Sequence, residues 1–189
     1  MSRFYANITL QGPGQDEVVG YLTERGAVAY VAPTAKGGTV VFHEDLAGQE
    51  DLTALLSGQF RCPALLVMAY GEAVLLYHLY ADGGQVDAYV SSPHEDLETD
   101  GQPMPEGNAE VLCKTFGMEH RLAGVTRILN RPTKPNTDFA LAANRHGELA
   151  RALGLPLFAA GAGYQSIEIG ELPAGQGFDA TKLVKTGAK

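Results

Sequence analysis

Apolar and polar residues alternate at the beginning of the chain. Between residues 4 and 11, apolar side chains at the even positions alternate with Tyr, Asn, Thr and Gln at the odd positions. A period of two is typical of a β-strand with one buried face. The stretch 15–26 has two acidic residues near its start, an apolar stripe and a glycine at its end. These features predict a helix directly after the first strand.

The next segments show the same two kinds of pattern. Residues 28–32 and 39–43 are mostly apolar, with β-branched and aromatic side chains, and a glycine-containing turn between them predicts a hairpin. Large apolar residues recur at helical spacing over 50–60, and Pro63 then ends the predicted helix. The run 64–70 is almost continuously apolar, which predicts a strand buried on both faces.

This order of elements predicts an α+β fold. Strand, helix, strand, strand, helix, strand is the order of a ferredoxin-like antiparallel sheet with two helices on one face. Two further strands, over 73–80 and 86–91, flank the turn residues Asp82, Gly83 and Gly84, and this hairpin extends the sheet. We therefore expect a mainly antiparallel sheet of about five or six strands.

The pattern changes after the second hairpin. Residues 93–106 are acidic and contain prolines, which is typical of a boundary loop. Over 107–153 the period becomes helical, and we expect several short helices there. A short strand over 167–169 and a glycine-rich tail from 170 onward, either a loop or a docked arm, complete the chain.

The predicted organisation has three parts. They are an α+β sandwich (1–92), an acidic loop (93–106) and a helical segment with its tail (107–189). The expected helices are short and apolar on one face only, so alone they would bury too little surface to offset the loss of chain entropy. We expect them to pack on the sheet and to form one cooperative unit with it.

The net charge of −8 is unevenly distributed. Residues 1–106 contain 15 acidic and 4 basic residues, whereas residues 107–151 contain 4 acidic and 7 basic ones. The negative total disfavours nucleic acid as a general partner, because binding a phosphate backbone needs concentrated Lys and Arg. The basic residues of the second stretch either bind an acidic partner or phosphate, or are solvated on outer helix faces. They are Lys114, Arg121, Arg127, Arg131, Lys134, Arg145 and Arg151.

Composition restricts the setting of the protein. Hydrophobic residues make up 45% of the chain and charged residues 19%, as in folded globular proteins. No apolar run approaches the roughly 18 residues that span a bilayer, so we expect a cytoplasmic protein with no membrane partner. Cys62 and Cys113 lie far apart without metal-ligand spacing and are expected to be reduced core thiols. No motif indicates a cofactor.

The second hairpin contains the clearest candidate chemistry. If its turn has two residues, His78 and Tyr80 fall on the same face as Asp87, Tyr89 and Ser91. An imidazole oriented by a carboxylate can transfer protons, which makes His78 and Asp87 candidate catalytic residues. Tyr80, Tyr89 and Ser91 are then candidate binding residues. A solvated sheet face with cross-strand polar pairs is the alternative interpretation.

Two other motifs fall short of a known site. Residues 94–101 match the first half of a calcium loop, but Gly107 occupies the position where the bidentate Glu is required, so no metal site is expected. Gly161 and Gly163 supply two of the three glycines of a dinucleotide fingerprint, with Ser166 in the third place. Because no βαβ unit surrounds them, we expect a turn that leads into the strand over 167–169.

Short patterns also occur in separate parts of the chain. They are Tyr77-His78-Leu79-Tyr80 with Gly83, Asp87, Tyr89, Ser91 and Pro93, then Gly163-Tyr164, and Gly170-Glu171-Leu172-Pro173. Together they resemble an uncharacterised bacterial protein family. The resemblance implies a bacterial cytosolic setting and brings with it no activity, cofactor or catalytic residue.

The sequence favours a non-enzymatic binding or regulatory module. No nucleophile motif, metal cluster or phosphate loop stands out, whereas a chain with two oppositely charged parts suits contact with a protein partner or with a second copy. The alternative is a small enzyme or metabolite-binding protein that uses the His78/Asp87 hairpin face.

Overall fold

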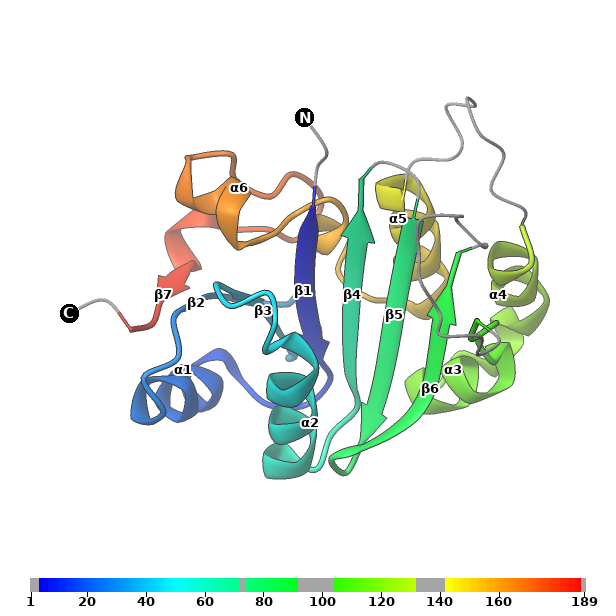
Figure 1. Ribbon diagram of the computed structural model, residues 1–189, viewed down its shortest axis with the longest axis horizontal. Coiled ribbons are helices and arrows are strands. Elements are labelled where there is room, and N and C mark those ends of the chain that lie inside the picture. Colours follow the sequence, from blue (N-terminus) through cyan, green and yellow to red (C-terminus); the bar gives the residue numbers. More distant parts are fainter. Residues whose placement is uncertain (1–3, 72–73, 92–103, 132–141, 188–189) are drawn as a thin grey trace.

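The computed structural model describes residues 4–71, 74–91, 104–131 and 142–187. Its strands form one antiparallel sheet of seven strands in the order β6-β5-β4-β1-β3-β2-β7 (Figure 1). The strands are β1 (Tyr5–Leu10), β2 (Ala29–Pro33), β3 (Thr39–His43), β4 (Ala64–Tyr70), β5 (Val74–Ala81), β6 (Gly84–Val90) and β7 (Val184–Lys185).

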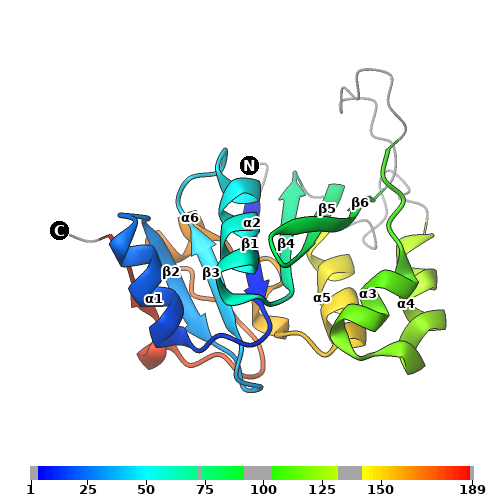
Figure 2. The ribbon, with the colours of Figure 1, turned by 90° about the horizontal axis from the view of Figure 1, so that it is seen from below.

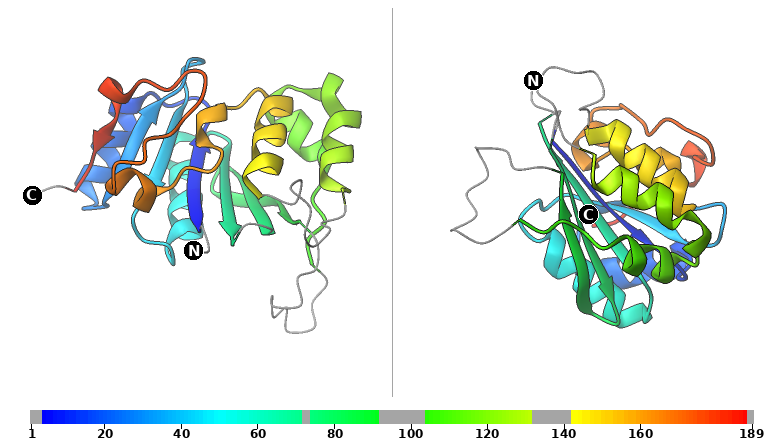
Figure 3. Two further views of the ribbon diagram at one scale, coloured as in Figure 1. Left: turned by 90° about the horizontal axis from the view of Figure 1, so that it is seen from above. Right: turned by 90° about the vertical axis from the view of Figure 1, so that its right-hand side faces the viewer.

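Helices cover both faces of this sheet, so the fold has three layers. The α-helices in the described residues are α1 (Gln15–Glu24), α2 (Gln49–Phe60), α3 (Ala109–Phe116), α4 (Leu122–Leu129), α5 (Ala142–Leu153) and α6 (Tyr164–Glu168). The right-hand view of Figure 3 shows α2 and α5 on opposite sides of the sheet. In Figure 2, α3, α4 and α5 gather at the end of the molecule away from α1. The fold is therefore α+β, as predicted.

A separate apolar cluster fills the space between the helices and each face of the sheet. Val18 of α1 and Leu56 of α2 are fully buried against β1, β3 and β4. On the other face, Leu112, Val125 and Leu149 of α3, α4 and α5 pack against β4 and β5. Burying one such side chain stabilises the fold by roughly 1.5 to 3 kcal/mol, so the helices predicted within 107–153 are held to the sheet by apolar contact.

The predicted strands and helices of the first half are confirmed, with two corrections. The sheet has seven strands because the C-terminal tail adds β7 beside β2. Strand β1 is buried on both faces along its whole length, although its alternation predicted one buried face. Its polar face lies under α5 and α6, where Asn7 is fully buried and donates hydrogen bonds to the carbonyls of Ala159 (2.8 Å) and Ala162 (2.9 Å).

The strand predicted over 167–169 is wrong, because these residues belong to α6 and its end. Gly163 precedes the helix, and the Ser166 hydroxyl accepts from its backbone N–H at 3.2 Å, as in a helix N-terminal cap. A Cβ at Gly163 would lie 3.0 Å from the Cβ of Tyr5. Glycine therefore lets this turn approach β1 closely, and the following residues continue as a helix over the sheet.

The glycine-rich tail is a docked arm. The Thr186 hydroxyl is buried and accepts from the backbone N–H of Ala29 at 3.0 Å, while the backbone N–H of Thr186 donates to the Ala29 carbonyl at 2.8 Å.

Cys62 and Cys113 are buried free thiols, and burial raises the pKa of Cys62 to about 11. Among the described residues, no helix is both long and apolar enough to cross a membrane.

Candidate functional site

The second hairpin has the predicted two-residue turn but also a β-bulge. Asp82 (φ 50°) and Gly83 (φ 82°) both have positive φ, as a type I′ turn requires. Beyond the turn, Tyr80 pairs with Gln85, but Leu79 pairs with Asp87. One extra residue, Val86, is therefore inserted into β6. A bulge of this kind reverses which residues of the two strands share a face.

The predicted shared face of His78 and Asp87 is consequently wrong. From Asp87 onward the odd residues of β6 pair with the odd residues of β5, so Tyr89 lies opposite Tyr77 and their rings stack at 5.3 Å. His78 lies opposite Ala88. The structure places His78 and Tyr80 on the α2 face and Asp87, Tyr89 and Ser91 on the face of α3 to α5. An Asp87 that orients His78 is excluded by this pairing.

Each of the separated residues has a local partner. His78 Nε2 lies 3.7 Å from Glu50 Oε1 of α2, and Tyr80 packs in the α1/α2 cluster. Asp87 accepts a hydrogen bond from the Tyr77 hydroxyl at 2.7 Å and from the backbone N–H of Asn108 at 3.0 Å. Asp87 therefore ties β6 to the start of α3. The Ser91 hydroxyl accepts from a backbone N–H of β5, which is also a structural contact.

The remaining motifs form no recognisable site within the described residues. The calcium-like loop over 94–101 lies outside the described residues, as does Lys134. In the described part of the chain, no three side chains of His, Cys, Asp or Glu gather as metal ligands would. Gly161 and Gly163 follow a short 3-10 helix (Leu157–Ala159) and not a strand, so the geometry of a dinucleotide fold is missing at this turn.

Four of the seven basic residues of 107–151, in contrast, are brought together in a groove between α4 and α5. The groove has a volume of about 430 Å³. Its described lining residues are Arg121, Gly124, Arg127, Ile128, Arg131, Glu148, Arg151 and Ala152. Four guanidinium groups thus surround one carboxylate in a protein whose net charge is −8.

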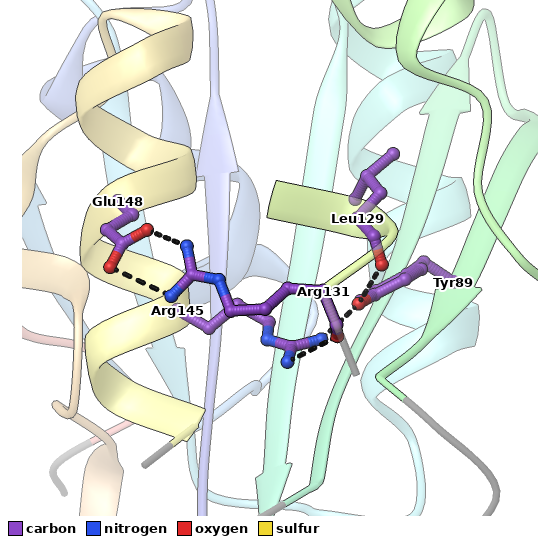
Figure 4. Close-up of polar contacts among 5 residues, drawn as sticks. All are labelled: Tyr89, Leu129, Arg131, Arg145 and Glu148. Carbon is purple, nitrogen blue, oxygen red and sulfur yellow. Dashed lines mark hydrogen bonds and ion pairs between the residues drawn. The ribbon is translucent and has the colours of Figure 1, made fainter. Parts of the chain in front are cut away.

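A network of polar contacts holds one side of this groove in place (Figure 4). Arg131, two residues beyond the end of α4, forms a two-pronged ion pair with Glu148 of α5. Arg145 is 4% exposed and donates to the Arg131 carbonyl at 2.9 Å and to the Tyr89 hydroxyl at 2.5 Å. The Tyr89 hydroxyl in turn donates to the Leu129 carbonyl at 2.9 Å. The network connects β6, α4 and α5.

The electrostatics of the groove favour binding an anion. The hydrogen bonds from Arg131 hold the pKa of Glu148 below its usual range, and Arg145 and Arg151 lower it further. Glu148 therefore stays ionised and neutralises Arg131. Arg121, Arg127 and Arg151 are exposed, and they make no hydrogen bond or ion pair within the described residues. Guanidinium groups of this kind bind carboxylates and phosphates through paired N–H donors.

Sequence reasoning identified these arginines but not their arrangement. Glu148 and Arg151 are three residues apart and share one face of α5, whereas Arg131 lies beyond the end of α4, four residues after Arg127. The spacing in the sequence could therefore have predicted the charged face of α5 but not the position of Arg131. No family model, curated protein or solved structure matches the chain. Any functional conclusion must therefore come from the groove itself.

Proposed function

We propose that this protein is a non-enzymatic binding module that receives an acidic segment of a partner protein in the α4–α5 groove. The proposal rests on one observation. Three guanidinium groups without a partner among the described residues, those of Arg121, Arg127 and Arg151, face a groove that contains a single carboxylate. Exposed cations concentrated in this way steer anionic partners and give them a defined orientation.

The groove is better suited to binding than to catalysis. A general acid or base needs a pKa near the working pH, whereas the pKa of Glu148 is lowered and its charge is neutralised by Arg131. The alternative function, a small enzyme or metabolite-binding protein on the His78/Asp87 hairpin face, loses its geometric support because the bulge puts these residues on opposite faces.

An acidic peptide fits the groove better than a nucleic acid does. The described lining contains no aromatic residue on which a base could stack. Residues 1–106 add a net charge of −11, which repels a long phosphate backbone. A short run of Asp and Glu side chains can instead place its carboxylates against individual arginines and leave the acidic remainder of the protein untouched.

We extend the proposal to the type of fold and to the place where the protein acts. We propose that residues 4–71 form a ferredoxin-like unit, supported by the strand order β4-β1-β3-β2 and by α1 and α2 packing on one face. The resemblance of the hairpin and tail patterns to a bacterial family supports a role in the bacterial cytosol. No cofactor is part of this function.

The test uses a fluorescent peptide of ten glutamates and measures its binding by anisotropy at low and high salt. We expect saturable binding that weakens as salt increases, because the groove pairs are exposed and screened. The double variant Arg121→Gln/Arg127→Gln should weaken binding by up to about thirtyfold, since each exposed pair contributes up to about 1 kcal/mol. Both side chains are exposed, so the fold should be unaffected.

The matched control is Lys114→Gln/Lys182→Gln, which changes the net charge equally but removes two exposed cations outside the groove. Peptide binding should be almost unchanged in this control. Equal loss in both double variants, or no binding at low salt, would refute the proposal. Tighter binding of a single-stranded oligonucleotide than of the peptide would assign the groove to nucleic acid instead. Light scattering would show whether a second copy is itself the acidic partner.

A further inference from the structure

A second cavity of about 300 Å³ adjoins the groove, with Arg151 lining both. Three distant segments meet around it: the turn between β2 and β3, the end of α5 with the residues that follow, and the C-terminal tail. The described lining residues are Thr34, Ala35, Lys36, Arg151, Gly154, Leu155, Pro156, Leu157, Phe158, Gln176 and Gly177. Nothing in the proposed function uses this cavity.

All the charged side chains among the described residues that line the cavity are cationic. Lys36 and Arg151 line it, and none of its described lining residues is Asp or Glu. Lys36 is held in place, because its ammonium donates to the Gly154 carbonyl at 3.1 Å. Arg151 has no hydrogen bond or ion pair to a described residue. Two cations without a carboxylate between them favour an anionic group at this end of the cavity.

Gly154 is needed to keep this arrangement open. It ends α5 with φ +69°, the left-handed conformation of a helix C-terminal glycine, and the Leu155 N–H donates to the Ala150 carbonyl at 2.8 Å. A Cβ at Gly154 would lie 2.8 Å from the Lys36 ammonium and 2.7 Å from the terminal methyl group of Met118. A side chain at this position would be strained by the positive φ, and the Lys36 ammonium and the Met118 methyl group would both have to move.

Most of the remaining cavity wall is apolar, and Thr34 and Gln176 add two polar side chains to it. Leu155 and Leu157 are only partly buried, and Phe158 is buried behind them. A smaller cavity of about 80 Å³ shares Lys36 and Leu155 with the larger one and reaches toward buried Leu10 of β1. Lys36 therefore lines both cavities next to leucine side chains, an arrangement that suits a ligand with one charged end and an apolar remainder.

We infer that this cavity binds a small monocarboxylate with an apolar tail, its carboxylate between Lys36 and Arg151 and its tail along Leu155 and Leu157. The volume corresponds to about ten water molecules at about 30 Å³ each, and so to a ligand of about ten non-hydrogen atoms. This site differs from the acidic-peptide groove in its ligand and adjoins it at Arg151, so the ligand and the peptide would compete for that residue.

Octanoate is the probe, with acetate and octanamide as matched compounds that lack the tail and the charge. Calorimetry measures the affinities, and the backbone amide resonances of Gly154 and Gly177 report the location. We expect saturable octanoate binding that shifts both resonances and is about tenfold or more tighter than binding of either comparison compound. Octanamide binding as tightly as octanoate, or resonance shifts away from the cavity, would overturn the inference.

Variants of Lys36 separate recognition from folding. Lys36→Met should weaken octanoate binding by about five- to tenfold, and Lys36→Arg should retain most of it, because a cation remains at the cavity mouth. Lys114→Met, on exposed α3 surface, is the control and should bind as the wild type does. Unchanged octanoate affinity in Lys36→Met would show that Lys36 only caps α5. If Lys36→Met fails to fold, Lys36→Arg provides the test. The inference would be overturned if Lys36→Arg bound octanoate more weakly than the wild type binds octanamide. Because this variant leaves Arg121 and Arg127 in place, the glutamate-peptide assay stays interpretable when the octanoate assay fails.

Discussion

Removing one hydroxyl group, by Tyr89→Phe, should destabilise the helical layer and disturb the groove. Tyr89 is 2% exposed, and its hydroxyl joins three elements by donating to the Leu129 carbonyl and accepting from Arg145. The substitution keeps the ring and its stacking on Tyr77, so packing in the core is preserved. Any loss of stability can then be assigned to the two hydrogen bonds.

The magnitude follows from the burial of both bonds. The bond to Arg145 involves a charged donor and contributes about 1.5 to 3 kcal/mol, and the neutral bond to the carbonyl contributes about 0.5 to 1.5 kcal/mol. Their sum is about 2 to 4.5 kcal/mol. In a chain of 189 residues this corresponds to a decrease in melting temperature of roughly 4 to 18 °C.

Urea denaturation measures the change, and an unaltered m-value would show that the loss is one of stability and not of compactness. The matched control is Tyr30→Phe, whose hydroxyl donates to Glu168 in an exposed setting and should contribute less than about 1 kcal/mol. A Tyr89→Phe variant within about 0.5 kcal/mol of the wild type, or no less stable than Tyr30→Phe, would refute the argument that this buried hydroxyl holds the layer together.

Two further predictions concern the same layer. Burial lowers the pKa of His146 to about 4 from 6.5, so the unfolded chain binds more protons between these values. The free energy of unfolding should be greatest above about pH 6.5 and fall by roughly 3 kcal/mol toward pH 4, and His146→Phe should remove this fall in urea titrations. A pH profile that the substitution leaves unchanged would contradict this. Calorimetry should also show one unfolding transition that salt hardly affects, whereas native-like stability in an isolated fragment 107–189 would disprove a single cooperative unit.

The local pattern of apolar and polar residues predicted strands β1 and β4, but it did not predict every face that is buried. The period-two alternation correctly predicted β1, and the apolar run 64–70 correctly predicted a strand buried on both faces. Alternation failed to predict the second buried face of β1, because Asn7 is polar yet satisfies carbonyls of a segment more than 150 residues away. The hydrophobic pattern shows which side chains favour burial by their apolar surface. It cannot show that a polar side chain is buried because distant parts of the chain provide its hydrogen-bond partners.

The prediction that His78 and Asp87 share one face of the hairpin was wrong for a similar reason. The turn residues Asp82 and Gly83 were sufficient to predict the turn length, but the register also depended on Val86. Only the bulge allows Tyr89 to stack on Tyr77 and Asp87 to reach the start of α3. Since neither contact is local, no inspection of the hairpin alone could have assigned its faces.

The groove arises from apolar packing, and this links its binding to the stability of the helical layer. Val125 and Leu149 pack in one cluster under α4 and α5, and the charged residues occupy the flanks of these apolar stripes. When the stripes pack, the flanks with Arg127 and Glu148 are forced to meet. Tyr89→Phe should therefore weaken glutamate-peptide binding, although Tyr89 does not line the groove, because it removes the bonds that fix α4 and α5 relative to β6. If the variant lost stability but bound the peptide with unchanged affinity, the groove would depend on the arginines alone and not on the geometry of the two helices.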